Sequence, residues 1–243
     1  MYKRQDEKAA ALDPPRTKCC KPAPSVLEFD QSGKLLRSWG GPGQGYDWPS
    51  NEHGIYVDAQ GFVWLAGNGD KDGQILKFTR DGKFVLQIGK PGDQTNSADT
   101  SRLGNPVHCV RIARDGLVYV CDRVNDRIQV FRKDGTFVKE IFVEKATRAN
   151  GSVWDLELFP DADETWLINA DGANNEVRLI RRDTGEVVGA FGRSGRNAGE
   201  FHWVHNLAID SKGNVFTTEV DNGKRAQKFL LRGDMVLRKR SAQ

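Results

Sequence analysis

The strongest constraint on the fold of this chain is a hairpin that recurs along it. Each copy alternates apolar and polar residues with a period of two and has a glycine at its turn, as in Asp81-Gly82 and Asp134-Gly135. This alternation is typical of a half-buried strand, and an Asp-Gly turn favours a tight hairpin. We therefore predict five antiparallel hairpins, over residues 25–40, 74–89, 127–141, 176–192 and 225–237.

A second type of hairpin alternates with the first. Its copies begin at His53, His108, Trp154 and His205. In the three histidine copies, apolar residues follow at the second and fourth positions and glycine at the eighth. One hairpin of each type supplies four strands, and four-stranded units that recur about every 50 residues are typical of propeller blades.

The two types of hairpin are unequal in number, because the hairpin at residues 25–40 has no clear inner partner before it. We predict an all-β fold, a β-propeller of four-stranded antiparallel blades, with five or so blades and one of them incomplete. The polar stretch 92–101 is long for a loop between blades and marks a candidate position for a missing unit.

The 243 residues suffice for one domain of this kind. We predict a flexible Pro/Lys-rich N-terminal segment over residues 1–24, the propeller over residues 25–237 and a basic tail over residues 238–243. Prolines at positions 14, 15, 22 and 24 make the first segment poor strand material.

Composition excludes some classes of partner. The net charge is only +3 and the basic residues are scattered, so no nucleic acid is expected. No apolar run approaches the ~20 residues that span a bilayer, so no membrane is expected either. The charged first residues predict that this chain carries no secretory signal peptide, and an exported or periplasmic protein in truncated form stays compatible with that.

The four cysteines are Cys19, Cys20, Cys109 and Cys121, and none has the CxxC spacing of a zinc site. If the turn at 114–116 closes a hairpin, Cys109 and Cys121 lie directly opposite each other. Opposed strand residues are close enough for a disulfide. Two small buried side chains are the alternative.

The repeated histidines are candidate metal ligands. Rotational symmetry would bring His53, His108 and His205 together around one axis, where three imidazoles hold a transition metal and leave a fourth position open. Glu52, Asp155 and Asn206 are candidates to orient these rings. The alternative is three satisfied structural histidines, and His202, the fourth in the chain, is expected in a loop.

These inner hairpins, followed by residues 122–131 (DRVNDRIQVF), resemble the NHL-repeat propellers over residues ~25 to ~232. Within that class the chain is most similar to the peptidyl-amidoglycolate lyase domain of the peptide-amidating enzyme and its bacterial relatives. The resemblance implies a family norm of six blades and a zinc ion held by His53, His108 and His205. It also implies a structural calcium, with Ile55 offering a backbone carbonyl and Asn206 standing where the family has aspartate.

The same resemblance implies that Arg123, which follows Asp122, binds a substrate carboxylate; a salt bridge between blades is the alternative. The family's tyrosine has no counterpart that we can match. Two functions therefore stay open. One is a metal-dependent carbon-nitrogen or carbon-oxygen lyase acting on a small-molecule or peptide-derived substrate. The other is a non-catalytic scaffold that binds a protein or another ligand on its top face.

Overall fold

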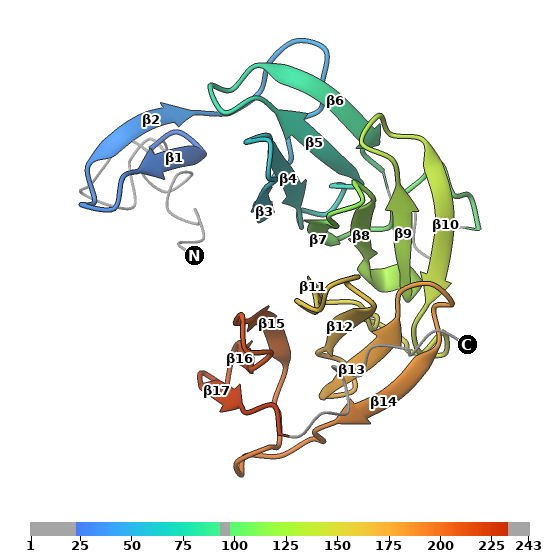
Figure 1. The fold of residues 1–243 in the computed structure, drawn as a ribbon. Helices are drawn as coiled ribbons and strands as arrows, with labels where there is room; N and C mark the ends of the chain where they lie inside the picture. Colours follow the sequence, from blue (N-terminus) through green and yellow to red (C-terminus); the bar gives the residue numbers. More distant parts are fainter. Residues whose placement is uncertain (1–22, 93–97, 233–243) are drawn as a thin grey trace, which may run out of the picture.

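The computed structural model describes residues 23–92 and 98–232 of the chain. Within these ranges the structure is all-β, and its one helical element is the short 3-10 turn Arg123–Asn125. No helix in the described ranges is long and apolar enough to cross a membrane. The sheets follow one another along an arc, from β1–β2 at one end to β15–β17 at the other (Figure 1).

Four blades and one shorter sheet make up this arc. The first sheet pairs β1 (Val26–Phe29) with β2 (Leu35–Trp39). Three four-stranded antiparallel blades follow, and the last blade has three strands within the described residues. The four-stranded blades comprise β3 (Glu52–Val57), β4 (Val63–Gly67), β5 (Gln74–Phe78) and β6 (Phe84–Gly89); β7 (Val107–Ile112), β8 (Val118–Asp122), β9 (Arg127–Phe131) and β10 (Phe137–Phe142); and β11 (Asp155–Leu158), β12 (Trp166–Asp171), β13 (Glu176–Arg181) and β14 (Val187–Phe191).

The last blade contains β15 (Val204–Ile209), β16 (Val215–Glu219) and β17 (Ala226–Phe229). The predicted all-β propeller is confirmed, and the first four predicted hairpins of the recurring type coincide with the pairs β1–β2, β5–β6, β9–β10 and β13–β14. Of the fifth, over residues 225–237, the structure describes one strand, β17, because residues 233–237 lie outside the described ranges. Within the described residues the first sheet has two strands, the hairpin predicted over residues 25–40. The N-terminal segment up to residue 22, part of the polar stretch 92–101 and the basic tail lie outside the described residues.

The core lies between neighbouring blades. One buried cluster joins Ile128 and Val130 on β9 to Leu156 and Leu167 on the next blade. Similar clusters fill the other junctions along the arc. The sheets inside the arc therefore bury apolar side chains on both of their faces, the two end sheets on one, and every blade depends on its neighbours for stability. The inner strands β3, β7, β11 and β15 lie on the concave side of the arc (Figure 1).

Candidate metal centre

Each predicted metal ligand lies on an inner strand, where that strand departs from regular pairing. The pairing of β3 with β4 shifts between Glu52 and Ile55, which flank His53. The pairing of β7 with β8 shifts between Val107 and Val110, around His108. The pairing of β15 with β16 shifts at His205, between Val204 and Asn206. Such bulges re-aim side chains, so the irregularity turns these rings toward the concave side.

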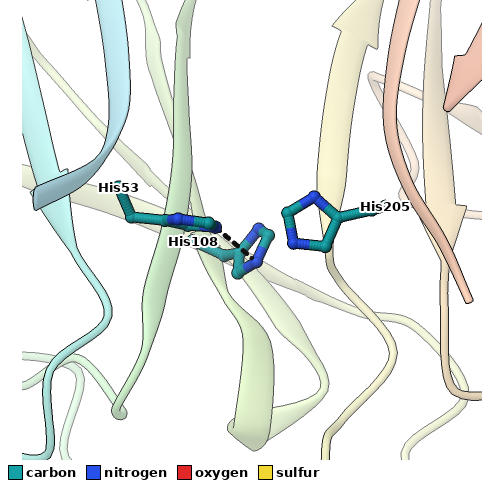
Figure 2. A group of neighbouring side chains, drawn as sticks. All are labelled: His53, His108 and His205. Atoms are coloured by element: carbon teal, nitrogen blue, oxygen red, sulfur yellow. Dashed lines mark hydrogen bonds between the residues drawn. The ribbon is translucent and has the colours of Figure 1, made fainter. Parts of the chain in front are cut away.

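The three rings meet, as the sequence predicts (Figure 2). One ring nitrogen from each of His53, His108 and His205 lies within 4.8 Å of the others. Ring centroids are 4.2 Å apart for His53 and His108, 4.6 Å for His108 and His205, and 5.3 Å for His53 and His205. Within the described ranges, no other group of three histidine, cysteine or acidic side chains comes together in this way.

The His108 ring is the most enclosed of the three, and only 2% of the residue is exposed. Its Nδ1 donates a hydrogen bond to the backbone carbonyl of Trp154, because a carbonyl can only accept. Nε2 of His108 is thereby left unprotonated, so its lone pair can accept a hydrogen bond or bind a metal. Burial holds the pKa of His108 well below its usual value, and the nearby His53, Arg123 and His205 lower it further. The ring is therefore neutral at neutral pH, which is the form that binds metals.

His205 is oriented in a comparable way from the last blade. Its Nδ1 lies 2.5 Å from the side-chain oxygen of Asn206, the next residue in the chain. Asn206 is one of the residues predicted to orient these rings, but adjacent residues of a regular strand point to opposite faces. The register shift at His205 removes that obstacle and places both side chains on the same side.

A hydrogen bond joins the rings of His53 and His108. Their Nε2 atoms are 2.8 Å apart, which is a hydrogen-bonding distance. Because Nε2 of His108 is the acceptor, Nε2 of His53 carries the proton. Tetrahedral zinc with Zn–N bonds of about 2.0–2.1 Å separates its nitrogen ligands by roughly 3.3 Å. The three imidazoles can therefore hold a transition metal once their nitrogens, which lie within 4.8 Å of one another, move to this separation and that proton moves to the other ring nitrogen.

Gly54 allows the close approach of the first two ligand strands. A Cβ atom at this position would lie 2.9 Å from the backbone oxygen of His108 and 3.4 Å from Cα of Cys109. Both neighbouring atoms belong to backbone and cannot turn aside. The absence of a side chain here lets β3 lie against β7, and so lets the His53 and His108 rings meet.

Arg123 lies beside the histidines as a cation without an ion pair in the described part of the chain. Its guanidinium carbon is 4.4 Å from the centre of the Trp154 ring, and its Nε is buried without a hydrogen-bond partner there. Burial lowers the pKa of Arg123 to about 10, so the group stays protonated at neutral pH. The partner of Asp122 is instead Arg127, whose Nε donates to that carboxylate over 2.6 Å. The predicted alternative, a salt bridge from Arg123 between blades, is not formed in the described residues.

Two tryptophans complete the surroundings of the histidines. The Trp154 ring lies 5.8 Å from His108, 5.6 Å from His205 and 6.0 Å from Trp203 between centroids. Trp203 is 36% exposed and has φ of 55°, a left-handed conformation that is rare for a bulky residue. Its backbone N–H donates to the side-chain oxygen of Asn175 over 2.7 Å, which helps to hold that conformation. Strained backbone of this kind gathers at functional sites.

Other candidate residues lie in different surroundings. Ile55 is on β3, two residues after His53, with 53% of the residue exposed. Calcium binding by Ile55 and Asn206 stays a prediction. Glu52 accepts hydrogen bonds from Ser25 and from the Trp48 indole, contacts that hold the β1–β2 sheet near its neighbour.

The cysteines of the second blade are joined. Cys109 and Cys121 form a disulfide with Cα atoms 4.9 Å apart, and the adjacent pairing of Val110 with Val120 follows the predicted register. Both cysteines are buried in the core between the second and third blades. The bond thus links β7 to β8 immediately after His108. Cys19 and Cys20 lie outside the described residues.

Comparisons with known proteins agree with this architecture. No family model matches the chain. It is 25% identical over 177 residues to NHL repeat-containing protein 3 of Homo sapiens, a match that covers 69% of this chain and 48% of the relative. The Mus musculus protein of the same name is 24% identical over 176 residues, with the same coverage. The chain spans about half the length of the curated relatives it matches.

Solved structures resemble the chain in fold. A Bacteroides caccae protein of unknown function superposes with a TM-score of 0.55 at 11% identity, covering 81% of this chain and 64% of that one. A streptogramin B lyase gives a TM-score of 0.54 at 15% identity, covering 85% and 76% of the two chains. At these identities the likeness concerns the fold alone. The recurring blades, the histidines on three inner strands and the likeness to NHL repeat-containing protein 3 together support a β-propeller of the NHL type.

Proposed function

We propose that this propeller binds one transition-metal ion, zinc in the first instance, through His53, His108 and His205, and acts as a metal-dependent lyase. The observation that carries the proposal is the convergence of three imidazoles from three blades. Two of them donate through Nδ1 to oxygen acceptors, which directs both Nε2 lone pairs inward. Three protein ligands leave a fourth position for a substrate oxygen, which a bound zinc ion would polarise.

Arg123 supplies the second element of the proposed site. The guanidinium is charged and stacked on Trp154, its Nε is buried, and it pairs with no carboxylate in the described residues. A half-buried arginine in this state is suited to a bidentate contact with a carboxylate. We infer a small-molecule or peptide-derived carboxylate as substrate, held by Arg123 against the ring of Trp154. The bond broken would be carbon-nitrogen or carbon-oxygen, in keeping with the resemblance to peptidyl-amidoglycolate lyase.

A calcium ion is the second metal that the resemblance implies. The Ile55 carbonyl and Asn206 would be its ligands from this chain. Because the Asn206 oxygen already accepts from His205, calcium binding there would compete with the orientation of that ring.

Metal content tests the proposal directly. The protein is purified without chelator or histidine tag, and its metals are counted by plasma mass spectrometry. We expect about one zinc ion per chain in the wild type and none in His108→Ala. His202→Ala, which alters the histidine outside the cluster, serves as control and keeps the metal. Retention of one zinc per chain by His108→Ala would contradict the proposed site.

A non-catalytic scaffold is the second candidate, favoured by apolar side chains that are open to solvent. Leu27 and Phe29 on β1 are 40% and 53% exposed, and Val57 on β3 is 57% exposed. Exposed apolar groups of this size often mark protein contacts. In this case a partner captured from native extract would bind wild type and His108→Ala equally, and Leu27→Glu would weaken capture. Loss of capture in His108→Ala would instead tie the partner to the metal centre.

A further inference from the structure

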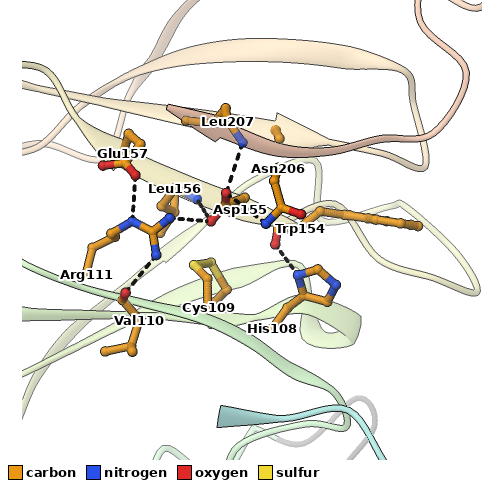
Figure 3. Close-up of polar contacts among 12 residues, drawn as sticks. His108, Cys109, Val110, Arg111, Trp154, Asp155, Leu156, Glu157, Asn206 and Leu207 are labelled. Atoms are coloured by element: carbon orange, nitrogen blue, oxygen red, sulfur yellow. Dashed lines mark hydrogen bonds and ion pairs between the residues drawn. A yellow bond between two sulfur atoms is a disulfide. The ribbon is translucent and has the colours of Figure 1, made fainter. Parts of the chain in front are cut away.

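We infer that Asp155, in the blade that lacks a histidine, positions the metal ligand His205 through Asn206. This inference rests on the proposed metal site and assigns Asp155 and Asn206 as positioning residues within it. Figure 3 draws the contacts of Asp155, which lies between Arg111 and the Asn206–Leu207 segment. Three blades meet at this one carboxylate.

Asp155 is almost completely enclosed, with 1% of the residue exposed. Its Oδ1 accepts from Arg111 Nη2 over 3.0 Å and from the Leu156 N–H over 2.9 Å. Its Oδ2 accepts from the Leu207 N–H over 3.0 Å and from Asn206 Nδ2 over 3.3 Å. A buried carboxylate is costly unless it is paired and hydrogen-bonded, and these four donors meet that need.

The contact with Asp155 decides which way the Asn206 amide faces. An ionised carboxylate can only accept hydrogen bonds, so the NH2 group of Asn206 must face it. The amide oxygen then faces His205 Nδ1. This assignment follows from the donors and acceptors present, which is the sound basis for orienting an amide.

The amide in turn decides the tautomer of His205. An amide oxygen only accepts, so His205 Nδ1 carries the proton and Nε2 keeps its lone pair for a metal. The Leu207 N–H contact anchors the same carboxylate one residue beyond the register shift on β15. Asp155 therefore holds both the bulge that aims His205 and the amide that orients its ring.

Arg111 supplies the balancing charge. Its Nη2 pairs with Asp155 and its Nε pairs with Glu157 Oε1 over 2.9 Å. Arg111 lies on β7, three residues after His108. The same ion pair thus joins the strand that carries one ligand to the residue that positions another.

The first test reads the His205 tautomer in metal-free protein by 15N NMR of the imidazole nitrogens. We expect the Nδ1-protonated form in wild type and a mixture of tautomers in Asn206→Ala. Asn214→Ala is the matched control, because Asn214 lies between β15 and β16, and its amide donates to the turn residue Asp210, away from the histidines. A wild-type His205 protonated on Nε2 would overturn the inference, whether or not the protein binds metal.

The second test measures zinc affinity with a competing chelator. Removing a group that orients a histidine ligand typically weakens metal binding by about 10–100-fold, which we expect for Asn206→Ala and for Asp155→Asn. Because the two act in series, the double variant should lose little more than the weaker-binding single variant. Asn206→Ala within about twofold of wild type would contradict the inference. If the wild-type protein bound no zinc, the proposed function would be refuted. The tautomer of His205 would then decide whether Asp155 and Asn206 orient its ring.

Asn206→Ala also keeps the test independent of folding. Asp155 holds strands as well as the amide, so Asp155→Asn can lose stability for structural reasons. Asn206 donates one bond and accepts one, and the strand pairing of β15 does not depend on its side chain. A calcium titration separates the two roles of Asn206: if it acted mainly as a calcium ligand, its substitution would weaken zinc binding only when calcium is present.

Discussion

Three inner strands of this propeller carry a bulge and a histidine, and the fourth carries neither. On β3, β7 and β15 the pairing shifts at the histidine, whereas β11 pairs with β12 in one unbroken register from Asp155↔Ala170 onward. The blade without a histidine still serves the site. Its Trp154 carbonyl accepts from His108, and its Asp155 accepts from Asn206. Three blades therefore carry the proposed metal ligands, and the blade without a histidine supplies the acceptors that orient His108 and, through Asn206, His205.

The largest effect on zinc affinity should come from removing a histidine that lies on one of the bulged strands. His205→Ala should weaken zinc binding by more than about a hundredfold, beyond what loss of an orienting contact costs. Trp154→Phe, immediately before the regular strand β11, keeps the carbonyl that accepts from His108 and should retain zinc. Chelator competition measures both. Equal losses of zinc affinity in the two variants would contradict the distinction between the strands that carry the proposed ligands and the blade that orients them.

Gly54→Ala should have the next largest effect, by separating two bulged strands. The new Cβ would meet the His108 backbone oxygen at 2.9 Å, so β3 must move away from β7. We expect a loss of about 1–3 kcal/mol in the free energy of unfolding, as for overpacking, together with weaker zinc binding. Gly189→Ala is the control, because a Cβ there meets nothing within 4 Å. Urea unfolding followed by tryptophan fluorescence measures both variants.

Arg123→Lys tests whether the arginine that stacks on Trp154 binds a carboxylate. Lysine keeps the charge and loses the planar fork, so binding of a simple probe such as N-acetylglycine should weaken by about tenfold while zinc content stays unchanged. Quenching of Trp154 and Trp203 fluorescence reports the probe. The exposed Arg132→Lys is the matched substitution and should bind like wild type. Unchanged probe affinity in Arg123→Lys would remove the arginine from the proposed site.

The smallest expected effect concerns how the regular strand is anchored. Asp126 accepts from the Ser152 N–H, just before β11, and burial raises the pKa of Asp126 from 3.8 to about 6. The folded state therefore holds this proton more tightly than the unfolded state does, and that contribution to stability is lost as pH rises from about 4 to about 6. Asp126→Asn should be about 1 kcal/mol more stable than wild type above pH 6 and no more stable near pH 4. The midpoints of urea unfolding, measured for both proteins across this pH range, test this prediction. A gain in stability that does not change with pH would show that the ionisation of Asp126 is not its cause.

Much of the architecture could be predicted from the sequence, because alternation and turn glycines are local signals. The strands around His53, His108 and His205 and the opposed positions of Cys109 and Cys121 follow from them. The register shifts could not be predicted, since a bulge depends on how two strands pair. For that reason Asn206 could be predicted as a candidate to orient a histidine ring, but its contact with His205, which a regular strand forbids, could not. The left-handed backbone conformation of Trp203 could not be predicted either, because Asn175, 28 residues earlier in the chain, helps to hold it.

An arc of blades whose buried apolar clusters join only adjacent blades is prone to fray from its ends, since each interface contributes separately to stability. The His53 and His205 rings, 5.3 Å apart, belong to blades with two other blades between them in the chain. A ligand that joins these rings would bridge several interfaces at once, so losing the terminal blade would also mean losing the ligand. Occupancy of the centre would then report on the cooperativity of the whole array, and unfolding should pass from gradual to concerted as the centre fills.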